Sequence, residues 1–289
     1  MQGKFLFLLL FLFTRLGANA QLETLVMLED SMFVAQQVMA TSEDDDEKFA
    51  ASDKFRTFMI EALNSDGCYE YPFSKLTSVG TIFSPDDKFR MFNWNVARFN
   101  ETHKYFCFIL TKDEKTGVYD WYELIDKERP IDKAETRFLT ADNWMGCLYY
   151  EIIPVKKNKR NTYYVLLAWD GNDKFTTKKV IDALSFERNG PRFGAQVFKE
   201  EKGTKKRIIL EYSSEVMVSV KYHRDMKSIV MDHLSPSDPS MTGVYAMYGP
   251  DLSFDSFRLL KGKWELHSDI DIRIERKDNK RPYNDPQER

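Results

Sequence analysis

Residues 84–126 constrain the fold of this chain more than any other stretch. They contain three apolar, aromatic-rich runs, at 89–96, 104–111 and 119–126, and the segments between these runs are short and rich in turn-forming residues. Runs of this composition and length, joined by such segments, are typical of consecutive antiparallel strands. The stretch therefore predicts an antiparallel meander.

The same pattern continues through most of the chain. Apolar runs recur every 8–14 residues or so, with Gly, Pro, Asn and Asp in the gaps, which is typical of an all-β fold and not of alternating strands and helices. The predicted strands are residues 79–83, 89–96, 104–111, 119–126, 147–155, 163–170, 177–186, 206–212, 216–222, 229–233, 244–248 and 258–267. We expect one mainly β domain over residues 66–274.

Two arrangements of this antiparallel meander remain open, a propeller-like fold and a curved two-layer sandwich. The propeller alternative rests on three groups of three strands, at 89–126, 147–186 and 206–233. It also rests on a turn-plus-strand phrase at 84–94, with a second similar turn at 249–257.

Residues 21–65 predict a helical hairpin before the β domain. In both halves of this segment, apolar side chains fall on an i, i+3, i+4, i+7 stripe. Between the halves lies the run Ser-Glu-Asp-Asp-Asp-Glu at 42–47, where Ser42 or an early aspartate can cap the second helix and the acids favour its N-terminal dipole. The run lacks the glycine and the alternating spacing of a calcium loop, so we interpret it as a solvated cap.

Residues 1–20 are typical of a secretory signal peptide. Lys4 precedes an apolar run at 5–13, and Ala18-Asn19-Ala20 is an A-x-A cleavage signature. The apolar run is shorter than the roughly 20 residues that span a bilayer. We expect cleavage after Ala20 and export to the periplasm or the outer membrane, with an uncleaved anchor as the alternative. No cysteine follows the cleavage site to accept a lipid.

Net charge and composition limit the classes of partner that this protein can bind. The formal net charge is -3, whereas binding to nucleic-acid phosphates needs a basic face, so nucleic acid is excluded as a partner. The segment 275–289 has almost no apolar residues and is predicted to be a disordered tail.

The sequence contains no recognisable catalytic or metal-binding motif. A nucleophile elbow and an H-E-x-x-H pair are both lacking, and the four histidines occur singly at strand edges. The cysteines are odd in number and widely spaced, which favours buried free thiols over a disulfide framework, with one disulfide involving Cys68 as the alternative. We therefore predict no catalytic, cofactor-binding or metal-binding residues. The residues considered are His103, His223, His233, His267, Cys68, Cys107 and Cys147.

The segment that most resembles a ligand-binding site follows the apolar run at 163–167. There Asp170, Asn172 and Asp173 could offer oxygen ligands to calcium, and Gly171 could allow the tight bend that such a loop needs. The same residues are ordinary members of a β-turn, and the twelve-residue EF-hand spacing is missing. We interpret the phrase as a turn, with an ion site as the alternative.

Six phrases carry a family resemblance: FRMFNWNV, YYVLLAWDGND, PRFGAQVF, KKRIILEYS, SIVMDHLSP and YGPDLSFDSFRLLKGKWEL. Together they resemble a group of exported proteins of Bacteroidetes-type envelopes, over most of residues 79–271. The resemblance implies an envelope location and assigns no catalytic residues. Among such exported proteins it suggests an association with the periplasmic plug subunit of the type IX secretion translocon.

These observations predict a non-enzymatic exported binding or scaffold protein, an accessory subunit of an outer-membrane or secretion assembly with a protein partner there. The helical hairpin is the expected docking element, and the alternative is that its apolar residues only pack on the β domain. Those residues are Met27, Met32, Phe33, Phe55 and Met59.

A second function is a secreted carbohydrate-active or glycan-binding protein. Export suits such a protein, and tryptophan rings could stack on sugars, although tryptophans within strands more often belong to the core. The tryptophans are Trp94, Trp121, Trp144, Trp169 and Trp264.

The export prediction has a direct test. Deleting residues 1–20 should leave the protein in the cytoplasm, because the signal that the export machinery recognises is removed. Mass spectrometry of the native envelope protein should place its first residue at Gln21. An envelope protein that still begins at Met1 would show an uncleaved anchor instead.

Overall fold

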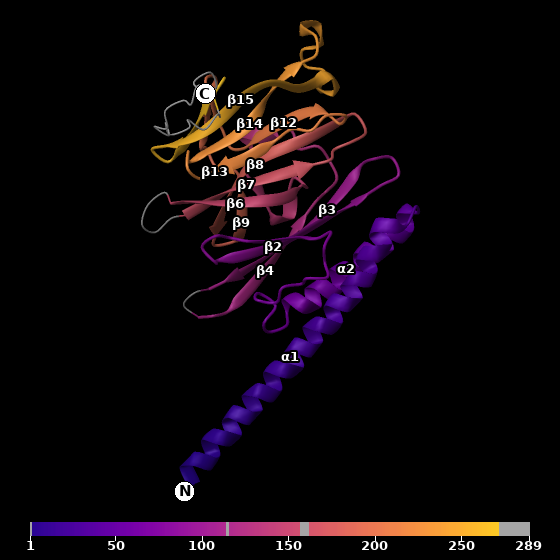
Figure 1. Ribbon diagram of the computed structural model, residues 1–289, viewed down its shortest axis with the longest axis vertical. Helices are drawn as coiled ribbons and strands as arrows, with labels where there is room; N and C mark the ends of the chain where they lie inside the picture. The colour runs from indigo at the N-terminus through magenta and orange to yellow at the C-terminus, as the bar shows by residue number, and fades with distance from the viewer. Residues whose placement is uncertain (1, 114–115, 157–161, 272–289) are drawn as a thin grey trace, which may run out of the picture.

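The computed structural model describes residues 2–113, 116–156 and 162–271, with side chains from residue 21 onward. A helical hairpin and three β-sheets form consecutive layers (Figure 1). Strands hold 45% of the residues and helices 21%, which confirms a mainly β, antiparallel fold with an N-terminal helical hairpin. The predicted tail at 275–289 lies outside the described residues. Within the part described with side chains, no helix is long and apolar enough to cross a membrane.

The hairpin consists of α1 (Gln2–Thr41) and α2 (Asp45–Leu63). Its turn confirms the predicted cap: the Asp44 carboxylate accepts a hydrogen bond from the Glu47 backbone N–H at 2.9 Å, and the Ser42 hydroxyl donates to the Glu47 carboxylate at 2.6 Å. The acidic first turn of α2 adds a favourable interaction with the helix dipole.

The first sheet is a meander of four strands in sequence order: β1 (Gly80–Phe83), β2 (Phe89–Ala97), β3 (His103–Lys112) and β4 (Tyr119–Ile125). Successive strand residues face opposite sides of a sheet. Phe92, Trp94 and Phe108 therefore pack against the hairpin, whereas Met91 and Cys107 pack against the second sheet.

The second sheet forms the middle layer and is buried on both faces. Its strands are β5 (Leu139–Thr140), β6 (Leu148–Lys156), β7 (Thr162–Asp170), β8 (Thr176–Glu187) and β9 (Gly190–Phe193), and β12 (Ile208–Ser213) pairs with β8. Leu166 and Ala168 of β7 contact the first sheet, whereas Val165 and Leu167 contact the third. Burial on both faces explains why β7 reads as a continuous apolar run.

The third sheet has the strand order β11-β10-β16-β15-β14-β13. Its pairs are antiparallel except that β10 and β16 run parallel. The bounds are β10 (Phe198–Glu200), β11 (Gly203–Lys205), β13 (Val220–His223), β14 (Ser228–Pro236), β15 (Tyr248–Leu260) and β16 (Lys263–His267). Short 3-10 turns η1 (Ala134–Thr136), η2 (Ala141–Asn143), η3 (Pro239–Met241) and η4 (Tyr245–Met247) complete the chain.

The sheets stack face to face as in a sandwich, with one layer more than a two-layer sandwich has. The described strands do not close into a barrel. All three cysteines are buried and free, which confirms the buried-thiol interpretation over a disulfide at Cys68.

Some strand predictions are wrong in the third sheet. Residues 244–248 form η4 and only the start of β15, and the turn predicted at 249–257 lies inside β15. Pro250 is tolerated in this strand because the pairing register with β14 shifts between Asp232 and Leu234. The strand predicted at 258–267 is a hairpin, because Lys261 and Gly262 both take positive φ and turn the chain.

Arg90 of β2 ties the segment between α2 and β1 to the first sheet. Its side chain is fully buried, and its guanidinium donates to the backbone carbonyls of Cys68, Tyr69 and Tyr71 at 3.2, 2.9 and 2.5 Å. It also lies 4.5 Å from the ring centres of Phe83 and Phe92. Burial lowers the pKa of Arg90 to about 10. Carbonyl oxygens and aromatic faces, instead of a carboxylate, therefore compensate the buried charge.

Replacing this guanidinium should cost considerable stability. Arg90→Met leaves several buried carbonyls without a donor, and we expect it to lower the free energy of unfolding by about 3 kcal/mol or more. Denaturant unfolding of the mature protein measures this. Arg258→Met, at an exposed position of β15, is the matched control and should change stability by less than about 0.5 kcal/mol. Equal effects of the two substitutions would contradict the anchoring role.

Candidate functional site

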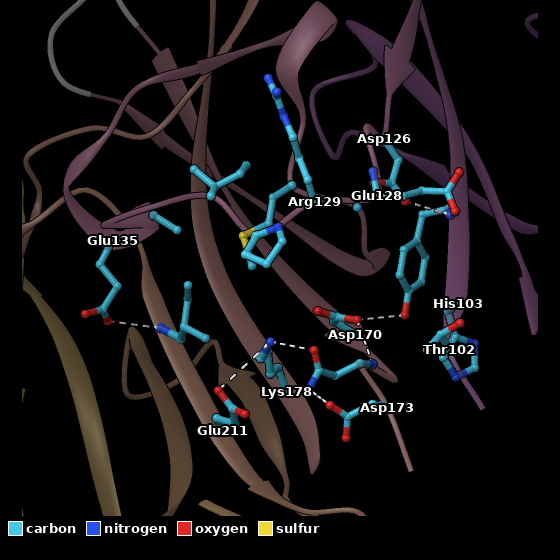
Figure 2. A pocket seen from close by; sticks show the side chains of 18 of the residues that line it. Thr102, His103, Asp126, Glu128, Arg129, Glu135, Asp170, Asp173, Lys178 and Glu211 are labelled. Atoms are coloured by element: carbon cyan, nitrogen blue, oxygen red, sulfur yellow. Dashed lines mark hydrogen bonds and ion pairs between the residues drawn. The ribbon is translucent and has the colours of Figure 1, made fainter. Parts of the chain in front are cut away.

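A cleft of about 840 Å³ opens at one edge of the first two sheets. It lies where β3 begins, β4 ends, β7 ends and β8 begins, and it also reaches β12 and the loop 126–136. Figure 2 shows Asp126 and Glu128 on one side of the cleft, Lys178 and Glu211 on the other, and Asp170 between them. A cleft of this size is typical of sites for small molecules.

Tyr105 connects two carboxylates at the floor of the cleft. Its backbone N–H donates to Asp126 Oδ2 at 3.0 Å, and its hydroxyl donates to Asp170 Oδ1 at 2.8 Å. The same hydroxyl accepts a hydrogen bond from the Gly171 N–H at 2.7 Å. The tyrosine is buried, so both carboxylates are held in fixed positions at the edge of the two sheets.

Two glycines allow this close approach. At Gly146, with φ +72°, a Cβ atom would lie 2.8 Å from Asp126 Oδ2. At Gly171, a Cβ atom would lie 2.4 Å from His103 Nε2 and 2.7 Å from the Trp169 ring. A larger residue at either position would push the floor apart.

His103 contributes a neutral ring to the floor. The Asn95 amide nitrogen lies 2.8 Å from His103 Nδ1, which places the ring proton on Nε2. Burial lowers the pKa of His103, despite the nearby charge of Asp170. The ring stacks on Tyr105 and meets Trp169 edge to face, so it acts as packing and as a hydrogen-bonding group.

The pKa of the Asp126 carboxyl is raised. Burial raises its pKa above the ordinary value, and the negative charges of Glu128 and Asp170 raise it further. The N–H groups of Glu128 and Tyr105 oppose this shift by hydrogen bonding to the carboxylate. The floor of the cleft is therefore a region of negative potential.

The glutamates around the cleft are paired with cations, whereas Asp173 accepts hydrogen bonds only from neutral groups of the described chain. Glu128 forms ion pairs with Arg98 and with Lys104. Glu135 pairs with Lys205 at 3.0 Å, and Lys178 lies 3.9 Å from Glu211. Burial opposes ionisation of Glu128, but the hydrogen bonds from Lys104 and Arg98 outweigh it and lower the Glu128 pKa.

The turn at 170–173 uses most of the oxygens considered for calcium. Asp173 Oδ1 accepts from the N–H groups of Phe175 and Thr176, and Asn172 Oδ1 accepts from the Lys178 ammonium at 2.6 Å. A lysine on that oxygen repels a cation. These bonds support the turn interpretation over the ion site. Among the residues described with side chains, no group of three or more His, Cys, Asp and Glu is placed to hold a metal.

The remaining candidates do not line the cleft, although Trp169 meets His103 at its floor. None of the five tryptophans is exposed: Trp94, Trp144 and Trp264 are buried, and Trp121 and Trp169 are partly covered. The three buried tryptophans are core residues and offer no open face for a sugar. His233 lies 2.8 Å from Asp255, which raises its pKa, in the third sheet. The histidines thus occur singly, as predicted.

Comparisons with protein-family models, with curated proteins and with solved structures give no match. The resemblance to exported envelope proteins therefore stays a prediction.

The raised pKa of Asp126 predicts a pH dependence of stability. Because its folded-state pKa lies above the unfolded value, the folded protein holds this proton more tightly. Relative to Asp126→Asn, wild-type protein should gain stability as the pH falls from neutral through the raised pKa, and the gain should be complete below the unfolded value of about 3.9. Denaturant unfolding of both proteins over this range measures the difference. A difference that is constant or shrinks on acidification would contradict the assignment.

Proposed function

We propose that this chain is an exported, non-enzymatic binding or scaffold protein of a bacterial envelope, an accessory subunit that docks through α1 onto an outer-membrane or periplasmic protein. Export rests on the signal segment at 1–20 and on the family resemblance. The lack of nucleophile and metal-ligand motifs in the sequence supports the non-enzymatic part.

The outer face of α1 carries this proposal. Five apolar side chains lie exposed there, led by Met27 at 70%, Val34 at 64% and Leu22 at 51%, together with Val26 and Phe33. The opposite face is buried through Leu25, Leu28 and Met32 in the core that α1 shares with α2 and the first sheet, and α1 packs mainly on α2. Exposed apolar surface of this kind on one element usually marks a contact with another molecule.

Some apolar side chains of the hairpin pack on the β domain, and others are free to dock on a partner. Met32, Phe55 and Met59 are fully buried in the core between the hairpin and the first sheet. Met27 and Phe33 are exposed and remain available to a partner. Figure 1 shows α1 at the outside of the stack, with one long side uncovered by the sheets.

Charge indicates the chemistry of the partner surface. Glu23 lies among the exposed apolar side chains of α1, where Asp30 is already paired with Lys75, and the hairpin tip adds exposed acids at 43–47. A complementary partner surface would be apolar at its centre and basic at its rim. The glycan-binding alternative is weaker, because the tryptophans that suggested it are not exposed.

Affinity purification from envelope extracts tests the docking surface. The tagged mature protein should retain an outer-membrane or periplasmic protein, and the double variant Met27→Ser, Val34→Ser should retain it at least about tenfold less, as expected when central apolar contacts are lost. Leu252→Ser, which removes a 92% exposed apolar residue from β15, is the matched control and should retain the partner fully. Equal retention by the double variant, or no partner at native expression, would refute the proposal.

A further inference from the structure

We propose that the cleft is a binding site for a zwitterionic ligand, an amino acid or short peptide with a free ammonium and a free carboxylate. The ammonium would lie at the floor, against Asp126 and Asp170, and the carboxylate would lie at the rim, against Arg129 and Lys133. This site is separate from the α1 surface and goes beyond the docking function.

The protein leaves some charges of the cleft without a counter-ion. Glu128, Glu135 and Glu211 of the cleft each have a lysine or arginine partner. Asp126 and Asp170 accept hydrogen bonds only from neutral groups of the described chain, namely backbone N–H groups and the Tyr105 hydroxyl. The floor therefore holds two carboxylates that lack a counter-ion.

An ammonium group fits the second oxygen of the Asp170 carboxylate. Asp170 Oδ1 already accepts from Tyr105 and Asn172, but no described residue donates to Oδ2, which lies in the lining of the cleft. An ammonium has three donors and can reach more than one acceptor. It would also offset the negative charge of Asp126, whose carboxylate binds the backbone N–H at the other end of Tyr105.

The rim carries the opposite charge. Arg129 and Lys133 line the cleft and both are exposed, and neither side chain has an ion pair or a hydrogen bond with the described part of the chain. Figure 2 shows the Arg129 side chain apart from the paired groups. A guanidinium is suited to bind a carboxylate through two parallel hydrogen bonds.

The loop that carries these cations is held in place from below. Asp126 Oδ1 accepts from the Glu128 N–H at 2.8 Å, which fixes its start. At its end, fully buried Arg207 donates to the carbonyls of Ala134 and Arg137 and to Asp182 Oδ2, the last at 2.9 Å. Because the loop is fixed at both ends, its backbone loses little conformational entropy when a ligand binds to Arg129 and Lys133.

The alternative ligand classes fit this charge pattern less well. A purely anionic ligand would leave the carboxylates of the floor unpaired and would be repelled by them. A simple amine would satisfy the floor and leave both cations of the rim without a partner. A neutral sugar could donate hydrogen bonds from its hydroxyls to the carboxylates, but it would leave the charges of the floor and of the rim without counter-ions.

Binding of chemically blocked peptides tests the proposal. The probe is a tryptic digest of a standard protein in three forms, untreated, with amines acetylated, and with carboxylates amidated, plus an equimolar mixture of the twenty amino acids. Ultrafiltration with the mature protein, followed by mass spectrometry, measures what is retained. We expect components of the untreated digest or the amino-acid mixture to be retained at least about tenfold more than their blocked forms, the effect of one charge-assisted hydrogen bond.

Two variants assign the ends of the ligand. Asp170→Asn keeps an oxygen for Tyr105 and Asn172, and should remove the discrimination against acetylated amines. Arg129→Gln should remove the discrimination against amidated carboxylates. Asp142→Asn and Arg258→Gln, both at exposed positions away from the floor and the rim, should bind as wild type does. Retention of the blocked forms equal to that of the free forms, no retention of any probe, or unchanged selectivity in both variants would overturn the proposal.

Discussion

The burial of both faces of the middle sheet is the constraint on which the rest of the structure depends. Val165, Leu166 and Leu167 are consecutive residues of β7, and all three are fully buried although they point to alternate sides. A strand of this kind needs a cover on each face. The first and third sheets provide it, and the hairpin in turn covers the outer face of the first sheet. The layered order follows from this requirement.

The same stacking creates the cleft. Since the first and second sheets pack face to face, the start of β3 lies over the end of β7, and polar residues at those strand ends meet. Tyr105 and Asp170 are 65 residues apart in sequence but 2.8 Å apart at their hydrogen-bonded atoms. A sheet can expose polar groups at its strand ends without disrupting its core. The packing of the two sheets therefore both buries the core and brings together the polar residues of the cleft.

Local patterns explain which parts of this fold could be predicted from sequence. The strands of residues 89–126, the hairpin and its cap at Asp44 depend on residues close in sequence, and they were predicted. The course of β15 was not, because Gly249-Pro250-Asp251 has turn chemistry and only the shifted pairing with β14 makes it a strand. The cleft was not predicted either, because its members come from two sheets whose packing no local pattern encodes. Arg90 and Arg207 show the same limit: a charged residue in a strand suggests an exposed position, yet both are fully buried on backbone carbonyls.

Amide hydrogen exchange of the mature protein tests the central role of the middle sheet most directly. If this sheet organises the stack, the amides of β7 and β8 should exchange only through global unfolding and should be the slowest in the protein. The amides of the hairpin and of the outer strands β1 and β13 should exchange faster, through local opening. Exchange in β7 and β8 that is as fast as in β1 and β13 would contradict this account.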